Sequence, residues 1–322
     1  MARISRQWMV THEWMVKPMS QAEWIEGKGL LVWLAEVFSA LGTGLYIVAL
    51  FFGLSDDFAM TAFWAGVCGW IGIAIFKLPL HLAYLGQPLR FWRAFPPFST
   101  AWRTSWFARG IVLTMIFLAF GVVQLVMQGL IAYDVNTGGG VHAANYVFMV
   151  LAGIFAVATA IYCGFAMSYC KSVPFWNTGL LPVIFLFMGV ADGLALTMGV
   201  GMVAGEEVVH TAEAATRIML ILNSLLILSY LVNASYQSET AELSVKKLIR
   251  GHVAWVFWLG IIVLGIIVPF VISVSSYFTG EDATTWLLIV AIVSHTIGAF
   301  SLKYGVLKVG YYRPIFPRAK AY

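Results

Sequence analysis

Charged residues are scarce in this sequence of 322 residues: Asp, Glu, Lys and Arg make up 11% of it, whereas hydrophobic residues make up 61%. Because charged residues usually form about a quarter of a soluble domain, this composition excludes an ordinary soluble protein. Cysteines are also few, and Cys68, Cys163 and Cys170 lie in or beside apolar segments without a CxxC spacing. We therefore expect neither a disulfide framework nor an iron–sulfur cluster in this chain, and we predict no metal site.

The N-terminal segment lacks the unbroken apolar core of a secretory signal. Residues 1–28 instead mix basic and acidic side chains with Trp8, Trp14 and Trp24, which favours a retained arm at the membrane surface. We therefore divide the chain into this interfacial arm, a membrane domain over residues 29–310 and a cytoplasmic tail over residues 311–322.

Apolar runs long enough to cross a bilayer, which takes about 20 residues, recur along the chain. We predict membrane-spanning helices at 29–53, 58–84, 107–132, 144–170, 175–203, 208–234, 252–276 and 284–310. Short polar breaks separate them, such as SDD near Asp56, NTGGG near Asn136 and GED near Glu281. The predicted fold class is an all-α integral membrane protein with eight transmembrane helices.

Basic residues are absent from one set of loops. The links that leave the odd-numbered spans carry only acidic charges, whereas the arm, the other links and the tail hold nearly every Lys and Arg. Because cytoplasmic loops carry the excess of Lys and Arg, we predict that both termini are cytoplasmic. The chain is expected to be a multi-pass protein of a bacterial cytoplasmic (inner) membrane, in contact with membrane lipids and not with nucleic acid.

The segment from His81 to Gly110 is a polar link between two apolar spans. It contains the string Leu85-Gly86-x-Pro88-Leu89-Arg90-Phe91, followed by Arg103-Thr104-Ser105-Trp106-x-x-Arg109-Gly110. A second string reads Val173-Pro174-Phe175-Trp176-Asn177-Thr178, followed by Leu181-Pro182 and Phe185. Together these strings resemble the NrfD/PsrC family of quinone-reactive membrane subunits, and the resemblance covers roughly residues 30 to 310.

This resemblance implies two four-helix bundles, made of spans 1–4 and 5–8, and a role as the membrane anchor of a molybdopterin and iron–sulfur oxidoreductase complex. It further implies electron transfer between a four-cluster ferredoxin-like iron–sulfur subunit and a quinone pool of menaquinone or ubiquinone. Iron–sulfur clusters and molybdopterin would lie only in the partner subunits. Arg93, Arg103 and Arg109 are candidates for docking the iron–sulfur subunit, through an acidic patch on that partner.

Members of the family anchor polysulfide, thiosulfate, dimethyl sulfoxide and arsenate reductases, several with partners outside the cytoplasmic membrane. In this chain the hairpin lies on the basic side, which the positive-inside rule places in the cytoplasm. That placement resembles the cytoplasm-facing sulfite dehydrogenase, in which sulfite oxidation feeds the quinone pool. We rank this type above a reductase anchor with periplasmic partners.

Ionisable residues at membrane depth mark functional sites by default. Those about 10 Å from the predicted cytoplasmic helix ends, at about 1.5 Å per residue, are Glu36, Lys77, Tyr162 and Lys303. Lys77 also shares one helix face with His81 and Tyr84, at spacings i, i+4 and i+7. A quinone needs hydrogen-bond donors or a proton source at its carbonyl oxygens and apolar walls around its tail. We predict a quinone site formed by Glu36, Lys77, His81, Tyr84, Arg90, Trp106 and Tyr162.

Two positions depart from the family pattern. In the dimethyl sulfoxide reductase anchor a histidine precedes Leu-Gly and a glutamate follows the later serine, whereas this chain has Tyr84 and Trp106 there; Arg90 matches. Either His81 takes the histidine's role from one turn earlier, or Tyr84 bonds the quinone as a tyrosine does in polysulfide reductase.

Purely structural roles are the alternative for this layer. Glu36 and Lys77 can form an ion pair that holds helices 1 and 2 together, and Lys77 or Lys303 can snorkel to the interface. His81 can merely cap a helix end.

A second polar layer lies nearer the opposite face. Asp192, Arg217 and His295 come to similar depth there, and Glu213 lies one turn above Arg217. The layer is either a proton path or a salt-bridged network in which Asp192 is the counter-charge of Arg217.

Two other classes of membrane protein remain alternatives. A haem b anchor needs axial ligands at membrane depth, but His81, His210, His252 and His295 lie mostly at helix ends without a facing pair, so no haem is predicted. A secondary transporter usually has interrupted helices in matching halves, which Pro182 and Pro269 do not provide.

Overall fold

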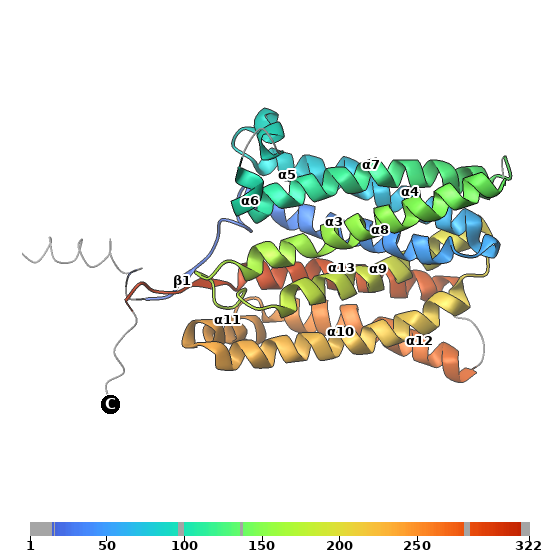
Figure 1. Ribbon diagram of the computed structural model, residues 1–322. Coiled ribbons are helices and arrows are strands. Elements are labelled where there is room, and N and C mark those ends of the chain that lie inside the picture. Colours follow the sequence, from blue (N-terminus) through green and yellow to red (C-terminus); the bar gives the residue numbers. More distant parts are fainter. Residues whose placement is uncertain (1–14, 16, 96–99, 136–137, 280–283, 317–322) are drawn as a thin grey trace, which may run out of the picture.

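The computed structural model describes residue 15 and residues 17–95, 100–135, 138–279 and 284–316. Eight helices in this part are long and apolar enough to cross a membrane, which confirms the predicted fold class. They run side by side (Figure 1), and helices suit lipid because each satisfies its own backbone hydrogen bonds. The chain is a multi-pass membrane protein.

The spans agree with the predicted ranges to within a few residues. In order they are α3 (Gly29–Phe52); a composite of η1 (Asp56–Phe58), α4 (Ala59–Ile71), η2 (Gly72–Lys77) and α5 (Leu78–Tyr84); α7 (Trp106–Ala132); α8 (Gly139–Ser168); α9 (Leu180–Ala204); α10 (Val209–Gln237); a composite of η4 (Val256–Ile267) and α12 (Val268–Thr279); and α13 (Thr285–Lys308). Shorter helices lie in the links: η3 (Pro88–Ala94) and α6 (Ala101–Thr104) before α7, and α11 (Glu239–Arg250) after α10. Within the two composites, η2 and η4 are π-helical.

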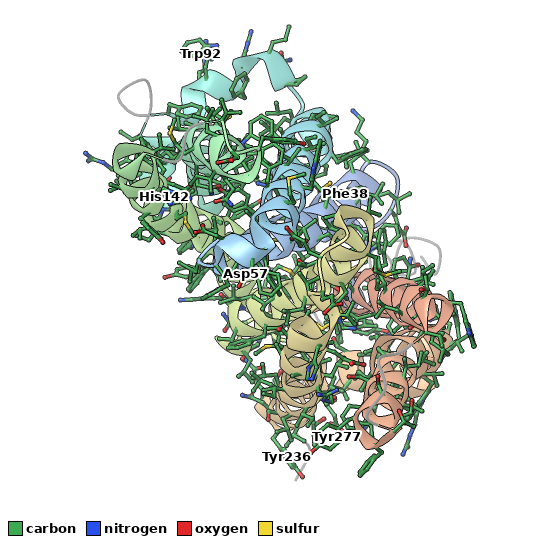
Figure 2. All side chains as sticks on the ribbon, turned by 90° about the vertical axis from the view of Figure 1, so that its right-hand side faces the viewer. Phe38, Asp57, Trp92, His142, Tyr236 and Tyr277 are labelled. Atoms are coloured by element: carbon green, nitrogen blue, oxygen red, sulfur yellow. The ribbon has the colours of Figure 1, made fainter. Side chains whose placement is uncertain are left out.

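Viewed along the helices, the spans form two groups (Figure 2). The first bundle holds α3, α4 to α5, α7 and α8, and the second holds α9, α10, η4 with α12, and α13. They join where α3 packs on α9: a Cβ at Gly44 would collide with the carbonyl oxygen of Gly189, and one at Gly193 with that of Gly44. Small residues allow such close approach between helices in membranes. The helices α3 and α9 are therefore the central pair.

One end of the molecule carries the hairpin, α11 and the described parts of both terminal segments, and we call it the basic face. Here β1 (Met19–Ser20) pairs antiparallel with β2 (Tyr311–Tyr312). Lys247 Nζ donates to Ser20 Oγ at 2.6 Å, and Lys308 Nζ lies 2.5 Å from Glu26 Oε1. Residues 17–28 of the predicted arm are thus held against the C-terminal segment, while its residues 1–14 and 16 and tail residues 317–322 lie outside the described residues.

The opposite end, which we call the acidic face, carries Asp56, Asp57, Asp134, Glu206 and Glu207. The Glu206 carboxylate accepts from the backbone N–H groups of Met60 at 3.1 Å and Thr61 at 2.8 Å. A negative charge at a helix N-terminus satisfies free N–H groups and complements the helix dipole. Glu206 therefore fixes the start of α4 to the link between α9 and α10.

Neutral polar side chains fill the acidic half of the first bundle. Tyr46 Oη donates to Gln124 Oε1 at 2.8 Å, and Gln124 Nε2 donates to Asn145 Oδ1 at 3.2 Å. Asn145 Nδ2 in turn donates to Gln128 Oε1 at 2.9 Å, and Gln128 Nε2 to the carbonyl of Ala59 at 3.5 Å. We call these four side chains the amide network. It joins α3, α7 and α8 through hydrogen bonds that end on a backbone carbonyl.

Candidate functional site

Four of the residues predicted for the quinone site meet inside the first bundle, and we call Glu36, Lys77, His81 and Tyr162 the basic-side cluster. The Tyr162 hydroxyl lies 3.3 Å from both ring nitrogens of His81. Lys77 Nζ lies 4.6 Å from the centre of the Tyr162 ring, and His81 Nε2 lies 3.9 Å from Glu36 Oε1. Each of the four is at most 4% exposed. The cluster thus gathers an acid, an ammonium group, an imidazole and a phenol in one buried place.

Local features of three helices create this convergence. The π-helical stretch η2 ends at Lys77, and such stretches rotate the side chains that follow relative to a regular helix. Lys77 Nζ donates to Thr114 Oγ1 on α7, and Thr114 Oγ1 donates to the Gly110 carbonyl at 2.7 Å. A Cβ at Gly110 would collide with the Tyr162 ring. Glycine at this position therefore lets the phenol reach the cluster.

Glu36 is the least satisfied member of the cluster. Tyr162 and Cys163 are close enough to act on its carboxylate electrostatically, yet neither oxygen has a hydrogen-bond partner among the described residues. Lys77 bonds Thr114 instead of Glu36, and Lys77 and Lys303 are buried at 2% and 4% exposure. The burial of both lysines excludes snorkelling, whereas a structural pairing of Glu36 and Lys77 stays the alternative, because the two groups act on each other electrostatically. Burying a carboxylate that lacks hydrogen bonds is costly, which favours a further polar group or a proton beside Glu36.

A cavity of about 320 Å³ lies beneath the hairpin and beside the cluster. Arg90, Gln87 and Ser105 line its polar side, and Phe107 forms part of its apolar wall. The Phe107 ring packs against His81 edge to face, with centroids 4.7 Å apart. Its volume falls in the range of about 300–1,000 Å³ typical of small-molecule pockets. One aromatic ring thus separates the hairpin cavity from the basic-side cluster.

The remaining predicted quinone residues lie outside the cluster. Trp106 stacks on Phe165 at 5.0 Å, which places it in the wall of α7 and α8. Tyr84 is only partly buried and lies instead within electrostatic reach of Glu23 and Tyr312 at the terminal segments. Arg90 is exposed at the cavity mouth.

The three arginines predicted for docking do not behave alike. Arg93 and Arg103 are exposed on the hairpin. Arg109 instead donates to the carbonyl oxygens of Trp102 at 2.9 Å and Arg103 at 2.5 Å, and its guanidinium lies 4.6 Å from the Trp106 ring centre. Its donors therefore hold the hairpin together, and its role in docking stays a prediction.

Comparison with known proteins places the chain in a family. A family model described as "Polysulphide reductase, NrfD" matches residues 70–315, which include the hairpin and seven of the eight spans in whole or in part. The chain belongs to the NrfD family. It is 24% identical to the C subunit of polysulfide reductase from Wolinella succinogenes over 238 residues, covering 70% of this chain and 74% of that protein. It is also 24% identical to "Protein NrfD" of Escherichia coli (strain K12), covering 74% of this chain and 79% of that protein.

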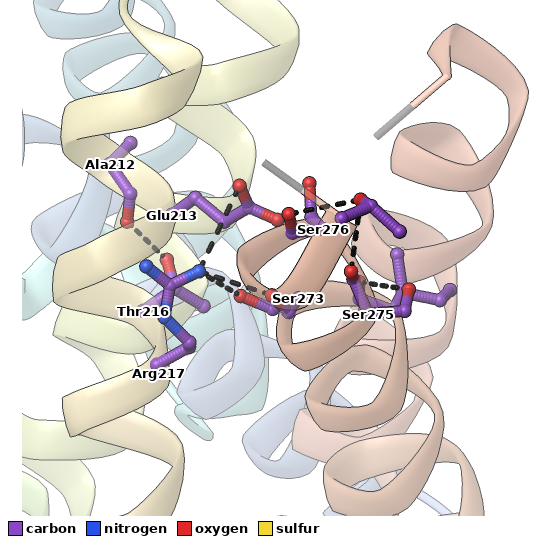
Figure 3. Close-up of polar contacts among 9 residues, drawn as sticks. Ala212, Glu213, Thr216, Arg217, Ser273, Ser275 and Ser276 are labelled. Carbon is purple, nitrogen blue, oxygen red and sulfur yellow. Dashed lines mark hydrogen bonds and ion pairs between the residues drawn. The ribbon is translucent and has the colours of Figure 1, made fainter. Parts of the chain in front are cut away.

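The second polar layer of this NrfD-family protein consists of two separate pairs. Asp192 on α9 faces His295 on α13, with Oδ1 3.2 Å from Nε2. Arg217 on α10 lies 3.9 Å from Glu213 and donates to the Ser273 carbonyl at 3.1 Å and to its hydroxyl at 3.2 Å (Figure 3). The predicted counter-charge of Arg217 was Asp192, which is wrong. Depth along a helix does not fix rotation about its axis, and Asp192 turns toward α13.

Several residues of these sites were not predicted. Thr114 and Phe107 contact the basic-side cluster, but a Thr and a Phe in an apolar span have no distinguishing sequence pattern. Glu206 was predicted only as one of the acidic charges in the link between spans 5 and 6. It also caps α4, because a carboxylate near a helix N-terminus can accept from the free backbone N–H groups there. The amides Gln124, Gln128 and Asn145 recur at polar positions in two neighbouring spans, a signal that was available.

Proposed function

We propose that this NrfD-family protein is the quinone-reactive membrane subunit of an oxidoreductase complex. It would carry electrons between an iron–sulfur partner on the basic face and the menaquinone or ubiquinone pool. The supporting observation is the basic-side cluster, where the Glu36 carboxylate, buried and without a hydrogen-bond partner among the described residues, lies beside His81 and Tyr162. The resemblance to the polysulfide reductase C subunit over most of both proteins points the same way.

The residues of the cluster fit a quinone headgroup. A bound quinone supplies two-electron, two-proton chemistry, so its oxygens need donors and a proton route. His81 and Tyr162 can donate hydrogen bonds, and Glu36 can take up or release a proton next to them. Lys77 Nζ lies beside the Tyr162 ring and can act on a ligand there electrostatically. Phe107 supplies an apolar wall of the hairpin cavity, and Arg90 can orient a ligand at the entrance.

Orientation and partners are part of the proposal. The positive-inside rule places the basic face in the cytoplasm of a bacterial inner membrane. Exposed Arg93 and Arg103 then offer a positive surface to a four-cluster ferredoxin-like subunit with an acidic patch, and a molybdopterin subunit would lie beyond it. A cytoplasmic partner favours the sulfite dehydrogenase type, with a polysulfide-reductase type and periplasmic partners as the second candidate because of the named relative.

Paired activity assays on the assembled complex test the quinone role. His81→Ala should lower quinol-linked turnover by about 100-fold or more, the range for losing a general acid or base, while turnover with an artificial dye at the catalytic subunit persists. His210→Ala, at an exposed histidine on the acidic side, serves as the control and should change neither activity. Equal loss of both activities in His81→Ala, or loss of neither, contradicts the proposal.

The orientation has its own test. Alkaline phosphatase is active only outside the cytoplasm, so a fusion at the C-terminus should be inactive. An active fusion would place the basic face outside and favour the reductase type with periplasmic partners.

A further inference from the structure

Asp192 and His295 lie in the middle of the second bundle, away from the basic-side cluster. Asp192 is the thirteenth of the 25 residues of α9, about 18 Å from either end at 1.5 Å per residue. Its exposure is 0% and that of His295 is 1%. Charged groups at this depth are costly unless paired. The pair therefore differs from contacts at the rim of the protein in being fully buried at mid-membrane depth.

The hydrogen-bonding state of His295 follows from its other neighbour. His295 Nδ1 lies 2.9 Å from the carbonyl oxygen of Gly265. Gly265 lies in the π-helical stretch η4, and Pro269, four residues further on, has no N–H that could bond this carbonyl. A carbonyl only accepts, so Nδ1 carries a hydrogen. In a neutral imidazole, Nε2 then presents a lone pair to Asp192.

A lone pair on Nε2 and a carboxylate oxygen 3.2 Å away repel each other. One proton between them removes this repulsion, and with it the pair is neutral overall whether the proton sits on oxygen or nitrogen. The low dielectric of the site favours the uncharged arrangement, in which a protonated Asp192 faces Nε2, over an ion pair. Neither Asp192 oxygen has any other hydrogen-bond partner among the described residues.

Charged groups flank the pair on both sides. Toward the basic face, Lys303 on α13 acts electrostatically on Asp192, so a positive charge is at hand when the pair loses its proton. Toward the acidic face, the charged neighbours are Glu213 and Arg217 on α10. The pair can thus exist with and without its proton.

A small cavity lies between His295 and Glu213, on the acidic side of the pair. Its volume open to water centres is about 20 Å³, room for roughly one water molecule. His295, Glu213, Thr216 and Ser273 line it. Glu213 is the fifth residue of α10, about 6 Å from the acidic end of that helix. One turn deeper on α10, Arg217 donates to the Ser273 carbonyl (Figure 3). Its guanidinium lies 5.1 Å from the ring centre of the exposed Tyr277.

We propose that Asp192 and His295 together hold one exchangeable proton in the middle of the membrane, and that this proton enters from the acidic face through Glu213 and the water-sized cavity. The site needs neither a quinone nor a partner subunit, so it stands apart from the proposed function. Glu213 and Arg217 form its polar entrance, and the Gly265 carbonyl orients His295.

Infrared spectroscopy of the resting complex tests the pair. The wild type should show the C=O stretch of a protonated carboxyl that moves in D₂O and is lost in Asp192→Asn. His295→Asn keeps a donor for the Gly265 carbonyl but cannot share a proton, so the band should shift and remain. The absence of this band in the wild type, its survival in Asp192→Asn, or an unshifted band in His295→Asn overturns the pair.

Exchange kinetics of the same band test the entrance. Ala291→Leu fills the cavity, and Glu213→Gln removes its ionisable group; each should slow exchange into D₂O at least about tenfold, because water must then wait for local opening. Val290→Leu enlarges the neighbouring side chain, which is 41% exposed toward lipid, and should leave the rate unchanged. Exchange at the wild-type rate in both Ala291→Leu and Glu213→Gln overturns the route. Because no turnover is measured, failure of the quinone proposal would leave these results intact.

Discussion

Two buried polar clusters occupy opposite halves of the first bundle, and they differ in how their hydrogen bonds end. The amide network runs from Tyr46 to the Ala59 carbonyl through neutral side chains that each meet a partner. The basic-side cluster contains ionisable groups, and both oxygens of Glu36 lack a partner among the described residues. A closed neutral network stabilises helix packing, whereas an open ionisable cluster is suited to a ligand and a proton. Burial alone does not distinguish the two.

Replacing the ionisable carboxyl group of Glu36 tests this difference between the two clusters most strongly. Glu36→Gln keeps the shape and hydrogen-bonding capacity but cannot ionise, so quinol-linked turnover should fall about 100-fold, the usual cost of a lost acid–base group. The assembled complex should still form, because an amide is cheaper to bury than a carboxylate. Steady-state kinetics with quinol and with dye measure the effect. Unchanged quinol turnover would show that Glu36 is only structural.

Arg90 lies outside the basic-side cluster, at the mouth of the hairpin cavity. Because its side chain is exposed at the cavity mouth, Arg90→Ala should raise KM for quinol about tenfold, or roughly 1.4 kcal/mol, and change kcat less. Arg93→Ala, at an exposed arginine that also borders the cavity and stacks on Trp92 at 5.4 Å, should leave KM for quinol near wild type. A fall in kcat alone for Arg90→Ala would place Arg90 in the chemical step.

A substitution in the amide network should have the opposite effect, lowering stability while leaving quinol turnover nearly unchanged. Asn145→Leu removes one hydrogen-bond partner each from Gln124 and Gln128, which should lower the free energy of unfolding by about 1–3 kcal/mol. Quinol turnover per folded complex should stay within about twofold of wild type, well below the 100-fold expected at an acid–base site. Detergent or thermal unfolding of the purified complex measures the first quantity. A large loss of turnover at unchanged stability would make the amide network functional.

The smallest effect is expected at the basic face. The Lys308 ammonium, which bonds Glu26, holds the pKa of that carboxyl below its ordinary value of 4.5. A lowered folded-state pKa means that the pair stabilises the protein above the unfolded value and stops doing so as pH falls through the folded value. Thermal unfolding of Glu26→Gln should therefore match wild type at low pH and differ slightly at neutral pH. A larger difference between Glu26→Gln and wild type at low pH than at neutral pH would contradict a lowered pKa of Glu26.

The sequence was sufficient for the spans and for the members of the basic-side cluster, and insufficient for pairings between helices. Long apolar runs identify helices without any tertiary information. Counting residues gives depth, which brought Glu36, Lys77 and Tyr162 to one level. Rotation about each helix axis depends on contacts such as Gly44 against Gly189, and no periodic pattern encodes them. That is why Asp192 was assigned to Arg217 instead of His295.

Departures from regular helix geometry also could not be predicted from the sequence. The π-helical stretches η2 and η4 each shift the side chains that follow, and Pro269 was considered only as a possible helix break. Pro269 instead lines the cavity beside His295, whose Nδ1 bonds the Gly265 carbonyl. Tyr84 was placed by a regular i, i+7 spacing from Lys77, which predicts a shared helix face but not the neighbours at the end of α5, so its position near Glu23 could not follow from that count.

Binding of a quinol analogue tests the quinone site most directly, because it requires neither electron transfer nor an active catalytic partner. The purified complex would be titrated with a hydroxyquinoline N-oxide whose fluorescence is quenched on binding. We predict saturable binding that His81→Ala weakens by at least about tenfold, or roughly 1.4 kcal/mol. Glu36→Gln, which keeps its hydrogen-bonding capacity, should weaken binding less than His81→Ala, and Asn145→Leu should leave it unchanged. Equal affinity in wild type and His81→Ala would contradict a quinone site at the basic-side cluster.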